Sequence, residues 1–128
     1  MRLLLDTHIF LALIGSGSAN LPKAVVALLE DGDAEPSLSA ASLWEIAIKA
    51  RLGKLRLTAE LEALPNLLDR LGIRVIPIDE RHALAAVNPE PMTRDPFDRM
   101  LLAQCQVEGL RLLAIDRALV SHPLAAKL

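Results

Sequence analysis

The sequence is poor in aromatic residues and has a single cysteine. It contains one Trp, two Phe and no Tyr among 128 residues. Proteins that hold single-stranded nucleic acid without sequence preference stack successive bases on several aromatic side chains, so this composition argues against an extended stacking platform. The single Cys105 excludes an internal disulfide and favours a reducing compartment. We therefore expect a cytoplasmic protein.

An excess of basic residues and a long hydrophobic run are also missing. Lys and Arg total 14 against 16 Asp and Glu, which gives a net charge of −2 at pH 7. The chain thus lacks the overall positive charge typical of many nucleic-acid-binding domains, and any nucleic acid would have to meet a local basic patch. No apolar run approaches the roughly 18 residues of a transmembrane helix, so we expect a soluble protein with no membrane partner.

The residues that are present predict one α/β domain spanning residues 1–128. Hydrophobic residues make up 52% of the chain, and a domain of this length can bury roughly two-thirds of its unfolded surface. Strand patterns, such as residues 3–5 and 112–115, alternate with helical patterns, such as residues 41–52 and 96–108. This alternation predicts right-handed crossovers, a parallel sheet and three layers, α/β/α.

An acid follows each of two apolar strand patterns. Asp6 follows three leucines that predict a strand buried on both faces, and Asp116 follows residues 112–115. In open α/β folds, ligands bind beyond the carboxyl ends of the strands. A buried carboxylate at Asp6 would need a cation, a hydrogen-bond donor or water. Asp116 has a simpler interpretation, because its side chain can cap a short helix that begins at Arg117.

Two further acids lie on the apolar stripes of predicted helices. Glu45 shares its stripe with Ala41, Ile48 and Leu52, and the stripe of Asp98 continues through Leu101, Leu102 and Cys105. A wide apolar arc with a partly exposed Glu45 is an equally good interpretation. Asp98 can also simply favour the positive end of its helix, with Asp95 as N-cap and Pro96 at the first helical position.

The four acids together favour a metal site. Carboxylates that meet in one cleft of low dielectric repel one another, and one of them protonates unless a cation intervenes. Oxygen ligands without His or Cys indicate Mg²⁺ or Mn²⁺ rather than zinc. Such an ion lowers the pKa of a bound water and stabilises charge on a phosphate.

Four segments carry a resemblance to a known family: residues 3–8 (LLLDTH), 39–49 (SAASLWEIAIK), 94–99 (RDPFDR) and 114–117 (AIDR). They resemble the PIN-domain ribonucleases, and most of all the VapC-type toxins of bacterial toxin–antitoxin pairs. The resemblance covers nearly the whole chain in the same order and spacing. It implies a metal-dependent endoribonuclease with a PIN-like α/β/α fold and a mostly parallel sheet of about five strands.

The resemblance also implies a set of residues and partners. Its acidic quartet falls on Asp6, Glu45, Asp98 and Asp116, which we expect to bind Mg²⁺ or Mn²⁺ and to be catalytic. We expect Thr7 and Asp95 to support these acids. The family often has Ser or Thr two residues before the last acid, where this chain has Ala114. The implied partners are an RNA substrate, a second copy of the chain in a homodimer, and a small cognate antitoxin protein that binds across the active-site groove.

Basic residues near the acids are candidates for phosphate contacts, because an acidic cleft without a basic rim would repel RNA. The candidates are Lys49, Arg51, Lys54, Arg94 and Arg99. For any one of them, ordinary solubilising surface charge is the simpler interpretation. We expect Trp44 to be a core or interface residue rather than an RNA-stacking group.

Two other functions compete with an RNA endonuclease. A phosphatase with a strand-end Asp nucleophile typically uses Asp-x-Asp, but the residue two positions after Asp6 is His8. A non-catalytic PIN-like module that binds RNA or protein would have lost acids of the quartet, and all four are present. Both remain alternatives to the hydrolysis of RNA phosphodiester bonds.

Overall fold

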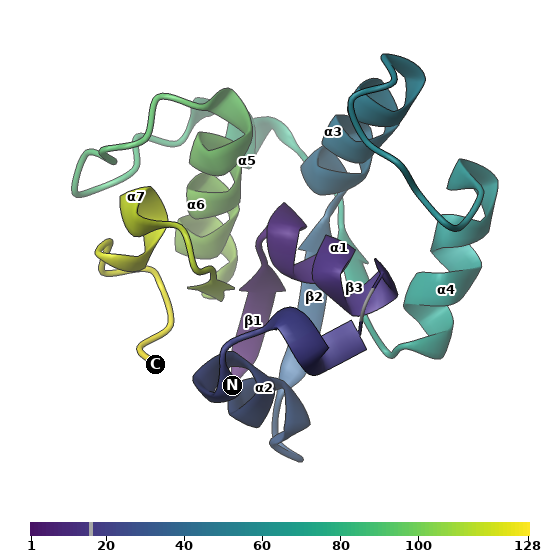
Figure 1. Cartoon of the computed structure of the whole chain (residues 1–128). Coiled ribbons are helices and arrows are strands. Elements are labelled where there is room, and N and C mark those ends of the chain that lie inside the picture. The colour runs from purple at the N-terminus through teal and green to yellow at the C-terminus, as the bar shows by residue number, and fades with distance from the viewer. Residues whose placement is uncertain (16) are drawn as a thin grey trace.

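A parallel β-sheet lies at the centre of the computed structural model, which describes residues 1–15 and 17–128. Within these residues the sheet has four strands in the order β3-β2-β1-β4, and every neighbouring pair is parallel (Figure 1). The strands are β1 (Arg2–Leu5), β2 (Glu35–Ser39), β3 (Arg74–Ile76) and β4 (Arg111–Leu113). The predicted fold class, an α/β domain with a parallel sheet, is confirmed.

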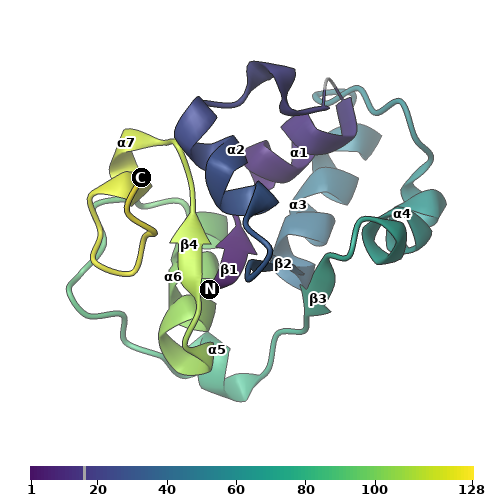
Figure 2. The same cartoon turned by 90° about the horizontal axis from the view of Figure 1, so that it is seen from below.

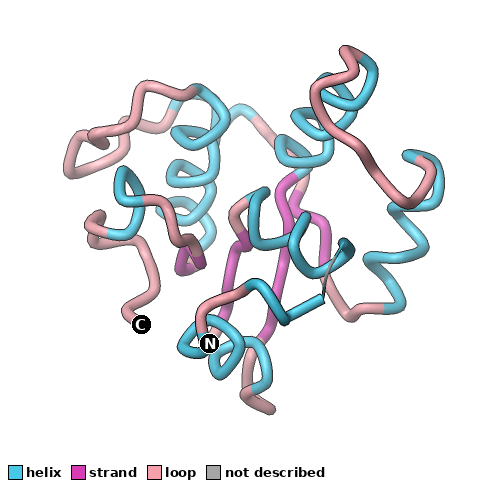
Figure 3. Tube along the Cα trace, viewed as in Figure 1, coloured by secondary structure: helices cyan, strands magenta, loops and turns pink. Residues whose placement is uncertain are grey.

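Helices connect the strands and cover both faces of the sheet (Figure 2). Two are short 3-10 helices, η1 (Gly17–Asn20) and η2 (Leu61–Ala63). The α-helices are α1 (Thr7–Gly15), α2 (Lys23–Glu30), α3 (Ala40–Arg51), α4 (Leu64–Arg70), α5 (Glu80–Leu84), α6 (Pro96–Glu108) and α7 (Arg117–Val120). Figure 3 shows the strands at the centre with helices and loops around them. No helix in the described part of the chain is both long enough and apolar enough to cross a membrane.

Side chains of β1 point alternately to two hydrophobic cores, as the strand period requires. Leu3 and Leu5 belong to the larger core, which includes Ile9 and Phe10 of α1. Leu4 belongs to the second core, with α6 and α7. All three leucines are fully buried, so the run of three apolar residues is explained by helices on both faces.

The sheet has four strands in the described residues where about five were expected, and beyond β4 there is a single bridge between Leu112 and Ala125. Leu112 N donates to Leu124 O at 2.9 Å, and Ala126 N donates to Leu112 O at 2.8 Å. The ladder stops toward its amino end because the amides it would need are engaged elsewhere. Leu124 N donates to the ring of His122, and Leu110 N donates to Cys105 O.

The helices that carry Glu45 and Asp98 each begin at a capping side chain, Ser39 for α3 and Asp95 for α6. Ser39 ends β2, and its Oγ accepts a hydrogen bond from Ala41 N at 3.0 Å, so α3 begins directly at the carboxyl end of the strand. Asp95 caps α6, with Pro96 at the first helical position. The α6 helix ends at Glu108 and is followed by Gly109, whose φ of +70° is the left-handed conformation favoured by glycine.

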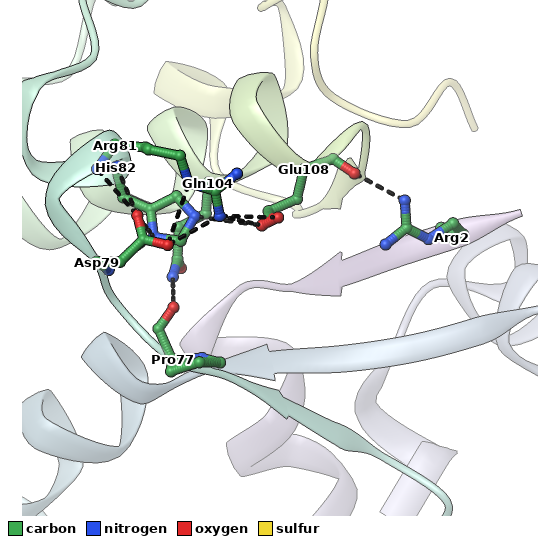
Figure 4. Close-up of polar contacts among 7 residues, drawn as sticks. All are labelled: Arg2, Pro77, Asp79, Arg81, His82, Gln104 and Glu108. Carbon is green, nitrogen blue, oxygen red and sulfur yellow. Dashed lines mark hydrogen bonds and ion pairs between the residues drawn. The ribbon is translucent and has the colours of Figure 1, made fainter.

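A polar cluster fixes α5 against the second half of α6 (Figure 4). The Asp79 side chain caps α5, and His82 Nδ1 accepts a hydrogen bond from Asp79 N at 3.0 Å. Arg81 forms ion pairs with both Asp79 and Glu108, at 2.8 and 3.3 Å. The cluster therefore links the start of α5 to the last turn of α6.

Two further hydrogen bonds tie α6 to the sheet. Gln104 Nε2 donates to the carbonyl of Pro77, just beyond β3, at 3.2 Å. Arg2 Nη1, on the first residue of β1, donates to Glu108 O at 2.7 Å (Figure 4). Because α6 is held to two strands in this way, its amino-terminal turn, which carries Asp98, has a fixed place relative to the sheet.

Candidate active site

Three of the four predicted acids follow the carboxyl ends of the neighbouring strands β2, β1 and β4, whereas Asp98 lies on α6, which begins after a loop that follows α5. Asp6 directly follows β1, and Asp6 N donates to Leu113 O, the last residue of β4, at 2.9 Å. Glu45 lies on α3, which begins at the end of β2, and Asp98 lies in the first turn of α6. Asp116 follows β4 by three residues. Asp6 and Asp116 thus share one edge of the sheet, since β1 and β4 are parallel neighbours.

Asp6 is almost completely buried, with 2% of its surface exposed. Its Oδ2 lies 3.2 Å from His8 Nδ1. Burial raises the pKa of Asp6, contact with His8 opposes the increase, and the charge of Glu45 adds to it. His8 was not among the predicted site residues, although its position two residues after Asp6 was the available signal.

Glu45 is also buried, with 6% of its surface exposed. The interpretation as a partly exposed residue is therefore wrong. Lys49, one helical turn later, places Nζ 2.8 Å from Glu45 Oε2. That hydrogen bond raises the pKa of Lys49, burial opposes the increase, and the charges of Asp95 and Asp98 add to it. The Lys49 ammonium group therefore interacts with acids of both α3 and the start of α6.

Asp98 accepts a hydrogen bond at Oδ2 from the hydroxyl of Thr93, at 3.0 Å. Burial raises its pKa to about 6, against the effect of the Thr93 hydrogen bond, and the charges of Asp95, Asp6 and Asp116 add to the increase. Asp95, in contrast, caps the helix through Oδ1. The two acids of this turn therefore differ in function, and Asp98 is the one that interacts electrostatically with the strand-end acids.

Asp116 caps α7, as its simpler interpretation predicted, with Oδ1 accepting from Ala118 N at 2.7 Å. Its second carboxylate oxygen is not used in that cap. Thr7 directly follows Asp6, and its buried hydroxyl donates to Ser42 Oγ at 2.8 Å. This bond joins α1, which follows Asp6, to α3, which carries Glu45. Ser42 and Thr93 support the acids without having been predicted.

The five basic candidates divide into two groups. Lys49 is paired with Glu45, and Arg99 holds the loop before α6. Arg99 Nε donates to Thr93 O at 2.8 Å, and Nη1 lies 2.8 Å from Glu90 Oε1. Arg51, Lys54 and Arg94 are exposed and form no ion pair within the described residues.

Trp44 is not a core residue, contrary to one of the two expectations for it. It is 63% exposed on α3. Its ring meets that of Phe97, at the start of α6, with centroids 5.8 Å apart and planes at 69°. The aromatic pair therefore joins the two helices that carry Glu45 and Asp98.

The chemistry of the acids fits a hard divalent cation. Four carboxylates supply oxygen donors, and the raised pKa values of Asp6 and Asp98 reflect burial together with neighbouring negative charge. Within the described residues, no three Asp, Glu, His or Cys side chains are arranged to hold one ion. Instead, each carboxylate contacts a partner of its own: His8, Lys49, Thr93 or the amide of Ala118.

Comparison with known proteins agrees with this geometry. The family model for the PIN domain matches residues 3–122, a range that contains all four acids. PIN domains form a superfamily of nucleases that generally use divalent metal ions, and the match supports a nuclease role with a nucleic-acid substrate. A search of curated proteins found no match to the sequence. With a matched range that covers most of the chain, this protein belongs to the PIN-domain family.

Proposed function

We propose that this protein is a metal-dependent endoribonuclease that hydrolyses RNA phosphodiester bonds, with Mg²⁺ or Mn²⁺ as its cofactor. The observation that carries the proposal is the electrostatic coupling of the acids. The pKa of Asp98 is raised to about 6 by burial, with contributions from Asp6 and Asp116, which follow two different strands. Acids from separate elements therefore repel one another, and a cation bound among them would relieve that repulsion.

In this proposal Asp6, Glu45, Asp98 and Asp116 hold the cation directly or through water. When bound, such an ion supplies an activated water and stabilises the charge that develops on the phosphate. The remaining residues position the acids. Thr93 orients the Asp98 carboxylate through its 3.0 Å hydrogen bond, and the Thr7–Ser42 bond fixes the helices beside Asp6 and Glu45.

The direct test is cleavage of several structured and unstructured RNAs by the purified chain. We expect cleavage with Mg²⁺ or Mn²⁺, loss of cleavage in EDTA, and recovery with excess Mn²⁺. Asp6→Asn should abolish cleavage while the protein stays folded. Asp69→Asn, the same change at an exposed position of α4, is the matched control and should leave cleavage intact.

Three results would overturn the nuclease proposal. Cleavage that persists in EDTA and in Asp6→Asn would indicate a contaminant or a different site. RNA binding without cleavage in any divalent ion would favour a non-catalytic PIN-like module. Hydrolysis of phosphomonoesters but not of RNA would favour a phosphatase.

We further propose that the protein is the cytoplasmic toxin of a toxin–antitoxin pair, acts as a homodimer, and is neutralised by a small antitoxin whose cationic side chain reaches the acids. The negative charge around Asp98 supports a cationic contact. A mostly apolar pocket of about 290 Å³ between α3 and α4 would suit an antitoxin segment; it is lined by Leu43, Ala47, Leu61, Leu64 and Pro65, together with the charged Arg51 and Glu62.

The toxin proposal is tested by expression in a bacterial host. Expression should arrest growth, Asp6→Asn should not, and co-expression of a short neighbouring open reading frame should restore growth. Sedimentation tests the dimer separately, because a monomer at all accessible concentrations would contradict it. Absence of toxicity in a chain that cleaves RNA in vitro would remove the toxin proposal alone.

A further inference from the structure

We propose that Trp44 and Phe97 form a stacking position for a single unpaired nucleobase of the RNA, on the two helices that carry Glu45 and Asp98. This inference rests on the proposed function, because it takes RNA as the substrate. It assigns a positioning task to two side chains that the acid chemistry does not use. The class of ligand is a base with both faces accessible, as in a single strand or a loop.

The first observation is the exposure of Trp44. Tryptophan is usually among the more buried side chains of a folded protein, yet 63% of the surface of this one is exposed on α3. In the sequence Trp44 immediately precedes Glu45, which is one of the most buried acids among the described residues. A large apolar ring is thus held in solvent on the helix that carries Glu45, where it contributes little to the core.

The second observation is the contact with Phe97. The two rings meet edge to face, with centroids 5.8 Å apart and planes at 69°. Such a contact can occupy one face of the indole at most. Phe97 therefore restrains the orientation of the Trp44 ring and leaves aromatic surface available to a partner.

The charges around the pair favour RNA over an apolar protein surface. Arg94 is exposed and unpaired within the described residues, and it lies three residues before Phe97. Lys49 is half exposed beside Glu45. A nucleotide needs both an aromatic surface for its base and cations for its phosphates. The low aromatic content of the chain argues against stacking of many bases, but one base needs only this one position.

The chain provides its own probe for this site. Trp44 is the only Trp and there is no Tyr, so tryptophan fluorescence reports on position 44 alone. The full-length protein is titrated in EDTA, which prevents metal-dependent cleavage, with short oligoadenylate and oligouridylate and with an RNA duplex. We expect the single strands to quench the emission and the duplex to quench it less, because paired bases are not available to stack.

Variants separate stacking from general apolar contact. Trp44→Phe keeps an aromatic face and should keep most of the affinity, whereas Trp44→Leu should lose about tenfold in affinity, within the usual range for one stacked base. Leu84→Ala, at an even more exposed apolar residue on α5, is the control and should bind as the wild type does. Circular dichroism confirms that each variant is folded.

The results distinguish this inference from the nuclease proposal. Quenching by single strands combined with no cleavage in Mn²⁺ would retain the stacking position and reject the nuclease. Cleavage in Mn²⁺, together with Trp44 emission that RNA does not quench and an unchanged RNA affinity of Trp44→Leu, would retain the nuclease and reject the stacking position. The inference is also overturned if the wild type binds no RNA. It is equally overturned if the Trp44 emission shifts to the blue with protein concentration alone and Trp44→Leu abolishes a dimer, because the ring would then belong to an interface between copies.

Discussion

The ammonium nitrogen of Lys49 lies 2.8 Å from Oε2 of Glu45, one turn earlier on α3. Glu45 is buried and Lys49 is half exposed, so the lysine reaches from solvent to a carboxylate that has little access to water. Its pKa is raised first by the hydrogen bond to Glu45 and further by the charges of Asp95 and Asp98. Lys49 is thus an internal counterion for the acids, in addition to its predicted contact with RNA.

Replacing this counterion should destabilise the metal-free protein. In Lys49→Met the buried Glu45 carboxylate loses its partner, which we expect to cost about 1–2 kcal/mol of unfolding free energy. Urea denaturation in EDTA measures the difference. Lys54→Met is the control, because Lys54 is exposed and forms no ion pair within the described residues. Equal stability of the two variants would contradict the assignment.

A divalent ion should stabilise the folded protein. A ligand that binds only the native state adds about 2.7 kcal/mol to the unfolding free energy when its concentration is 100 times its Kd. We therefore expect Mg²⁺ or Mn²⁺ to raise the melting temperature of the wild type, and Asp98→Asn to reduce that increase. Asp69→Asn should respond as the wild type does. Thermal unfolding that is insensitive to both ions at high concentration would remove the metal site.

Asp98 should make the stability of the metal-free protein depend on pH. Its folded-state pKa of about 6 exceeds the unfolded value of about 3.9, so between these values the folded state holds a proton that the unfolded state has lost. The contribution of Asp98 to stability is therefore full below about pH 4, falls as the pH rises through about 6, and stays low above that.

Asp98→Asn should remove this dependence. Relative to the wild type, we expect the variant to gain about 1 kcal/mol of unfolding free energy between pH 4 and pH 7, since partial exposure to solvent limits the effect of the pKa shift. Denaturation in EDTA across this range measures it. A difference that is constant with pH, or that has the opposite sign, would show that the carboxyl titrates normally.

The sequence predicted the parallel α/β architecture because a strand that is buried on both faces has a distinct run of consecutive apolar residues. The three leucines before Asp6 required helices on both sides of β1, and both cores are present. The number of strands was not predicted correctly, because the ladder beyond Leu112 depends on where the amides of Leu110 and Leu124 are bonded. Leu124 N donates to the ring of His122 and Leu110 N donates to Cys105 O, and a pattern of apolar residues does not indicate such bonds.

The sequence indicated the acids of the candidate site better than it indicated the contacts of the residues around them. The apolar stripe around Glu45 fitted a buried and a partly exposed carboxylate equally well, and the structure, with 6% exposure, has the buried one. The contacts of Arg99 could not be predicted, because an arginine side chain suits both a phosphate contact and a hydrogen bond to a loop carbonyl. The exposure of Trp44 could not be predicted either, because an aromatic ring on a helix faces the core only if a neighbouring element packs against that side of the helix.

Arg94 and Arg99 are five residues apart and should respond differently to substitution. Arg99 donates to Thr93 O and pairs with Glu90, so Arg99→Ala should loosen the loop that places the Thr93 hydroxyl on Asp98. We expect a loss of about 1–2 kcal/mol of stability and faster amide exchange at residues 90–94.

Arg94→Ala removes an exposed cation with no such bonds. It should leave stability within about 0.5 kcal/mol and weaken RNA binding in a way that reduces the salt dependence by about one charge. If Arg99→Ala instead reduces the salt dependence and leaves the loop protected from exchange, then Arg99 contacts phosphate in the complex and its bonds to the loop are not what fixes Thr93.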